Sequence, residues 1–132
     1  MIDHEVKIFS RVYDAAAPLC ANKKFVSTVI TEKPAGFPAA SLIEMDNVTV
    51  WDRQSSTPKE NFARVTYQLD VFATSKNDCR KVFAAADGAM MAMNFNRISG
   101  SYIGNSDNTT VFRYTARYEA EIDPDGNIYR RG

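Results

Sequence analysis

The sequence has little of the chemistry that enzymes use most often. Its 132 residues include one histidine, His4, and two cysteines, Cys20 and Cys79. The cysteines lie far apart and form no CxxC pair, and a single histidine cannot complete a zinc tetrad with them. We therefore expect no metal site, and two buried thiols that behave as small apolar side chains in a reducing compartment.

An excess of charge of either sign is also missing. The 16 basic residues (Lys and Arg) balance the 16 acidic ones. Nucleic-acid binding draws on a net or clustered positive field, so we expect no sequence-specific nucleic-acid binding, although the balance leaves a local basic patch open. A chain without net charge has little self-repulsion, so it can self-associate without a long-range barrier.

Long hydrophobic runs are absent as well. No segment approaches the roughly 18 apolar residues that a membrane-spanning helix needs. Residues 1–5 show no basic region leading into an apolar one, so we expect no secretion signal, no membrane partner and synthesis in the cytosol. The length fits one domain of roughly 100–200 residues, so the prediction is a single domain over residues 1–132.

What is present is clear hydrophobic periodicity, which predicts two amphipathic helices. The first has apolar residues at alternating steps of four and three: Ile2, Val6, Phe9, Tyr13, Ala16 and Cys20. Pro18 predicts that this helix ends or kinks near Ala17. The second has the stripe Cys79, Val82, Phe83, Ala86, Met90 and Met93. Ser75, with Asp78 three residues later, resembles a capping box at its start.

Period-two alternation predicts the strands. The clearest covers residues 62–74, with Arg64, Thr66, Gln68 and Asp70 on its polar face. A second long strand covers 110–122, with Arg113 and Arg117 on its polar face. Further strands are predicted over residues 25–31 and over 40–51, the latter with a bulge at 46–47. A weaker strand is predicted over 95–103 and a short final one over 128–130. This order predicts an α+β fold, with one mainly antiparallel sheet of about four to six strands and two helices packed on one face.

No catalytic or nucleotide-binding motif is present: GxSxG, GxxxxGK[ST], GxGxxG and HExxH are all missing. Residues 123–127 suit a turn and lack the acid at the twelfth position of a calcium loop. Glu119 and Glu121 share a strand face with Arg113 and Arg117, and a mutually compensating solvated surface explains them better than an acid/base pair. We predict that the protein is not an enzyme and uses no cofactor.

Three segments in this order around the second helix, residues 65–75, 94–98 and 112–118, resemble bacteriophage tail-terminator and tail-completion proteins. These are minor structural proteins of long-tailed phages, including head-to-tail joining proteins. The resemblance covers most of the chain. It consists of the order of the elements and of local sequence similarity rather than of an invariant motif. It implies a homo-oligomeric ring, commonly a hexamer, which caps the tail tube protein and meets the head–tail connector protein. It also implies a place in the tail or neck of the virion after assembly in the host cytoplasm, and no catalytic residues.

Candidate interface residues fall in three places. The polar loop 53–60, which departs from the shorter members of the family, offers Arg53, Gln54, Lys59 and Glu60. The polar face of the last long strand offers Arg113 and Arg117, and the chain end offers Arg130 and Arg131. We hypothesise that the loop contacts a neighbouring ring.

Other functions stay open at this point. The nearest alternative is another head–tail connector or minor capsid protein. A monomeric binding module that uses a sheet edge belongs to a second class. An enzyme is the weakest alternative, because its essential groups would be carboxylates, arginines and tyrosines in no recognisable arrangement.

Overall fold

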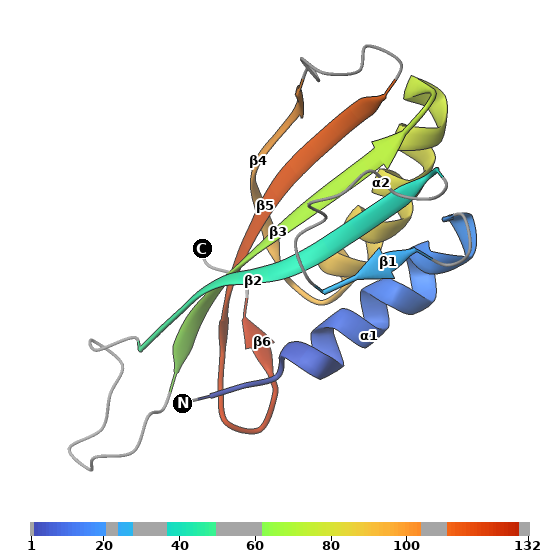
Figure 1. Ribbon diagram of the computed structural model, residues 1–132. Helices are drawn as coiled ribbons and strands as arrows, with labels where there is room; N and C mark the ends of the chain where they lie inside the picture. Colours follow the sequence, from blue (N-terminus) through green and yellow to red (C-terminus); the bar gives the residue numbers. More distant parts are fainter. Residues whose placement is uncertain (1, 21–23, 28–36, 50–61, 104–110, 130–132) are drawn as a thin grey trace, which may run out of the picture.

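The computed structural model describes residues 2–20, 24–27, 37–49, 62–103 and 111–129. Within them lie two α-helices, a 3-10 turn and six strands (Figure 1). In chain order these are α1 (Glu5–Ala16), η1 (Ala17–Leu19), β1 (Phe25–Val26), β2 (Ala39–Thr49), β3 (Ala63–Ala73), α2 (Lys76–Ala92), β4 (Asn96–Ile103), β5 (Phe112–Ile122) and β6 (Ile128–Tyr129). The predicted α+β class is confirmed.

The six strands form one curled, mostly antiparallel sheet. Their order is β1-β2-β3-β5-β4, and β6 pairs with the far end of β5, beyond the part that β4 covers. Only β1 and β2 are parallel. β3 and β5 pair along their whole length, from Ala63 opposite Ile122 to Ala73 opposite Phe112. The register of β2 shifts between Glu44 and Asp46, next to the predicted bulge.

Both helices lie on the same side of the sheet (Figure 1). They contact each other, and α2 also contacts β3 and β5. Tyr67 of β3 and Tyr118 of β5 are almost fully buried between these layers, and the Tyr67 ring meets Phe95 edge-on at 5.5 Å between ring centres. Asp87 of α2 accepts a hydrogen bond of 2.6 Å from the Tyr118 hydroxyl and pairs with Arg97 of β4 at 3.3 Å. These contacts fix α2 against the centre of the sheet.

The second helix agrees with its prediction. Cys79, Val82, Ala86 and Met90 form its buried face. The Ser75 hydroxyl accepts a hydrogen bond of 3.1 Å from the Asp78 backbone N–H, which satisfies one of the orphan donors at the helix start. Both cysteines are buried free thiols, as expected. Burial raises the pKa of Cys20 to about 11 and also raises that of Cys79, so neither thiol is activated.

The predicted stripe of the first helix is wrong at Val6. Val6 is 80% exposed, and α1 buries Ile8 and Val12, which the predicted stripe omits, together with Ala16, which it includes. The helix begins at Glu5, so Ile2 lies before it and cannot set its helical phase. Counting from Ile2 therefore placed Val6 on the core side. The end of the helix is as predicted, because Pro18 falls in the short 3-10 turn that follows Ala16.

The corrected face of α1 can be tested with one residue type at two positions. Val12→Ala should lower the free energy of unfolding by about 2 kcal/mol, because Val12 is fully buried and its removal leaves a cavity. Val6→Ala should change it by less than about 0.5 kcal/mol, because Val6 is exposed. Urea unfolding followed by circular dichroism measures both. Equal losses for the two variants would contradict the assignment of the buried face.

Candidate functional site

Two of the predicted interface residues lie within the described residues. Arg113 and Arg117 stand on β5, on the sheet face away from the helices, since they alternate with the buried Ala116 and Tyr118. The others lie outside the described residues: Arg53, Gln54, Lys59, Glu60, Arg130 and Arg131.

A chain of polar side chains runs across this outer face, from β5 to β3 and back. Arg113 donates two hydrogen bonds to Oδ1 of Asp70, from Nη2 at 3.0 Å and from Nε at 3.3 Å. Gln68 donates to Oδ2 of Asp70 at 3.0 Å and accepts from Nε of Arg117 at 3.2 Å. Asp70 is only 5% exposed, so these partners take the place of the water that would solvate an exposed carboxylate. We call Arg113, Asp70, Gln68 and Arg117 the outer ladder.

The ion pairs on this face join residues of β3 to residues of β5. Arg113 pairs with Asp70 of β3, and Arg64 of β3 lies 3.7 Å from Glu119 of β5. The guanidinium carbon of Arg113 also lies 5.5 Å from the centre of the Phe72 ring. The sequence alternation placed Asp70 and Gln68 on the polar face, but only the register of β3 against β5 brings them to the arginines.

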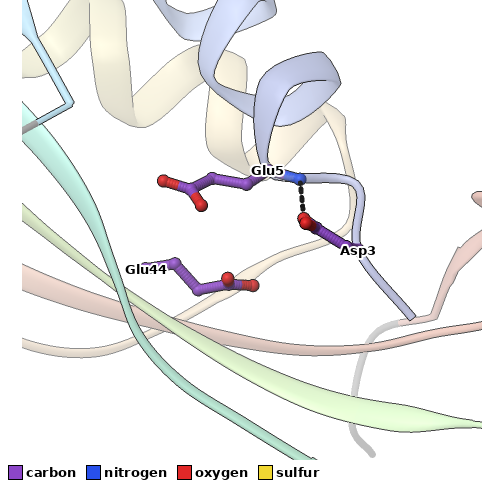
Figure 2. Close-up of side chains that lie close together, drawn as sticks. All are labelled: Asp3, Glu5 and Glu44. Carbon is purple, nitrogen blue, oxygen red and sulfur yellow. Dashed lines mark hydrogen bonds between the residues drawn. The ribbon is translucent and has the colours of Figure 1, made fainter. Parts of the chain in front are cut away.

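An acidic cluster lies on the helix side of the sheet, near the start of α1. Carboxylate oxygens of Asp3, Glu5 and Glu44 all lie within 4.8 Å of one another (Figure 2). They come from the segment before α1, from its first turn and from β2. The Glu5 backbone N–H donates to Asp3 at 3.1 Å, and the Tyr67 hydroxyl donates to Glu44 at 3.3 Å. Carboxylates can bind hard cations, but acidic groups at a protein surface are also common without one.

The surroundings of Glu44 in this cluster shift its pKa. Its pKa is raised, first because burial disfavours the charged carboxylate, and then because Glu5 and Asp3 repel a third negative charge. Hydrogen bonds from Tyr67 and Asn47 oppose the shift without cancelling it. The sequence did not reveal this cluster, because nothing in the chain indicates that Asp3 and Glu44 meet.

A groove of about 640 Å³ opens beside the other flank of α1. Its walls are α1, the end of α2, the β5–β6 turn and β6, which Figure 1 shows beside the start of α1. His4, Lys7 and Arg11 supply basic groups, and Ile8, Met93 and Ile128 supply apolar ones. The sequence predicted the turn at 123–127 but not its position against α1.

The turn that forms one wall is held by hydrogen bonds. The Asp123 carboxylate accepts from the backbone N–H groups of Asp125 and Asn127 at 3.0 and 2.9 Å, and from the Tyr129 hydroxyl at 3.0 Å. Gly126 follows with φ +90°, a conformation that favours glycine. A Cβ at Gly126 would lie 3.2 Å from Nζ of Lys7 and 3.4 Å from the His4 ring, so glycine lets the turn approach α1 closely.

Comparison of the chain with protein-family models and with curated proteins finds no match. In the part of the chain that the structure describes, neither helix is both long and apolar enough to cross a membrane.

The contacts of the outer ladder predict that Arg113 contributes more to the free energy of unfolding than Arg117 does. Arg113→Met should lower the free energy of unfolding by about 2 kcal/mol, because it leaves the buried Asp70 carboxylate without its cation. Arg117→Met should cost about 0.5 kcal/mol or less, because Arg117 is exposed and bonds a neutral amide. Urea unfolding measures both. Asp70→Asn added to Arg113→Met should recover much of the loss, and an unchanged loss would argue against the ion pair as its cause.

The acidic cluster predicts a pH dependence. The folded state raises the pKa of Glu44, so it binds this proton more tightly than the unfolded chain does. Stability should therefore fall as pH rises from about 4.5 through the raised pKa. Glu44→Gln removes this charge, so it should raise the melting temperature at neutral pH and flatten the fall. Thermal unfolding across a pH series measures this, with Asp14→Asn, an exposed carboxylate of α1, as the control. A lower melting temperature for Glu44→Gln at neutral pH would refute the repulsion.

Proposed function

We propose that this chain is a phage or prophage assembly protein, a ring-forming tail terminator that caps the tail tube and joins it to the head connector. The resemblance of residues 65–75, 94–98 and 112–118 to that family supports the proposal. The structural observation that supports assembly is a sheet with two different edges, each of which carries exposed apolar side chains.

One edge is β4, which among the described strands has a neighbour on one side only. Its pairing with β5 is interrupted between Arg97 and Ser99, and Ile98 at this bulge is 52% exposed. The other edge is β2, because within the described residues β1 pairs with it only at Ala40 and Ser41. Met45, at the β2 bulge, is 48% exposed, and Val48 is 36% exposed.

Two unlike edges suit a ring. A closed ring of identical subunits needs a heterologous contact, in which one surface of each subunit meets a different surface of the next. An open strand edge offers backbone donors and acceptors to a neighbouring strand, and exposed apolar side chains add burial on contact. In the proposed ring, β4 of one subunit meets β2 of the next. The outer ladder then leaves a polar, ordered sheet face for water or for other tail components.

The same edges also fit two other functions. Another head–tail connector or minor capsid protein would use them in the same way. A monomeric binding module would add a peptide strand from its target to one of them. The mass of the free protein separates the module from the ring, and binding to tail tubes separates the terminator from other connectors.

Light scattering over a concentration series tests the ring and its edge together. The 14.8 kDa chain should form a closed species near the mass of a hexamer, with no larger species. Ile98→Lys should shift the mass toward the monomer, because a lysine ammonium would be buried in the contact. Val6→Lys, an exposed position on α1, is the control and should leave the mass unchanged.

The opposite result is also informative. A monomer at every concentration that also fails to bind purified tail tubes would refute the terminator function and favour the binding module. An Ile98→Lys protein that still forms the ring would remove β4 from the contact.

A further inference from the structure

The groove beside α1 takes no part in the proposed edge contact. Its lining contains basic side chains. Lys7 and Arg11 lie four residues apart on one flank of α1, and His4, the residue just before the helix, lines the same groove. No aspartate or glutamate is among the described residues that line the groove. Neither Lys7 nor Arg11 forms an ion pair with any residue in the described segments. Lys7 and Arg11 therefore bring positive charge to the groove without an ion-pair partner among the described residues.

Hydrogen bonds within the protein hold the walls of the groove in place before any ligand binds. Asp123 holds the β5–β6 turn through its hydrogen bonds, and Gly126 lets this turn lie against Lys7 and His4. The Asn94 side chain, just after α2, donates to the Ile128 carbonyl at 3.1 Å and so ties α2 to β6. A ligand that enters the groove meets side chains whose backbone supports are already ordered, so little conformational entropy is lost on binding.

The mixed lining indicates the class of ligand. The apolar part of the lining, which we call the apolar floor, consists of the buried Ile8 and Met93 and the half-buried Ile128. This combination suits a segment that carries both carboxylates and apolar side chains. A nucleic-acid backbone fits less well, because it is a continuous line of phosphates with no apolar side chain to place against Ile8, Met93 and Ile128.

We propose that this groove binds a short acidic peptide segment of a partner protein, with Lys7 and Arg11 pairing its carboxylates and the apolar floor taking a neighbouring side chain. Its volume of about 640 Å³ lies within the range of roughly 300–1,000 Å³ that ligand sites occupy. The identity of the partner as another tail or neck component rests on the proposed function, whereas binding by the groove can be measured without it.

The test uses the full-length protein and a fluorescein-labelled eight-residue peptide of alternating glutamate and leucine. Fluorescence anisotropy at low ionic strength should show saturable binding that weakens as salt is added, because the contact includes ion pairs at a partly open site. The same peptide with glutamine in place of glutamate should bind at least about fivefold more weakly.

Two matched variants locate the site. Lys7→Gln should weaken binding of the acidic peptide by about fivefold, and Lys7→Gln with Arg11→Gln by more than about tenfold. Lys81→Gln makes the same change at an exposed position of α2 and should leave binding unchanged. Light scattering of each variant should give the wild-type mass, which separates a failure of the groove from a failure of ring assembly.

Three results would overturn the inference. The wild-type protein could show no saturable binding at millimolar peptide. Lys7→Gln and Lys81→Gln could bind equally well, which would place the contact elsewhere. A single-stranded thymidine oligonucleotide could bind more tightly than the peptide and lose affinity in Lys7→Gln, which would make the groove a nucleic-acid site instead.

Discussion

The uninterrupted pairing of β3 with β5 is the constraint on which the rest of the structure depends. Its register, from Ala63 opposite Ile122 to Ala73 opposite Phe112, fixes which side chains face the helices. Because side chains alternate along a strand, a slip of one residue would turn the buried Tyr118 outward and Arg117 inward. The same register places Asp70 within reach of Arg113, so the core and the outer ladder follow from one set of backbone hydrogen bonds.

The local parts of this fold can be predicted from the sequence, and the parts that depend on register cannot. Alternation over residues 62–74 and 110–122 is enough to identify β3 and β5 and their polar faces. It does not say which residue of one strand lies opposite which residue of the other. Arg113 and Asp70 lie 43 positions apart in the sequence. Their pairing could not be predicted, although both residues were correctly assigned to the polar faces of their strands.

The two helices show how a local signal succeeds or fails. Ser75 caps α2 through a contact three residues along the chain, so the sequence alone marks the helix start. At α1 the cap residue His4 makes no side-chain capping bond, and the apolar Ile2 lies just before the helix. Because no capping residue marks the start of α1, the apolar positions of this helix were counted from Ile2, which lies outside it. Ile2 is nevertheless buried, because the Asn47 amide donates to its carbonyl at 2.7 Å and holds this segment against β2.

A net charge of zero conceals a division of charge around α1. Asp3 and Glu5 turn toward Glu44 of β2, whereas His4, Lys7 and Arg11 line the groove beside the β5–β6 turn. The acids and bases interleave in the chain, so no window of sequence shows a charged run. They are separated in space because the two acids lie near Glu44 of β2, whereas the three basic residues face the groove beside the β5–β6 turn. Composition therefore limits only the long-range field of this protein, and its local surfaces can still be strongly acidic or strongly basic.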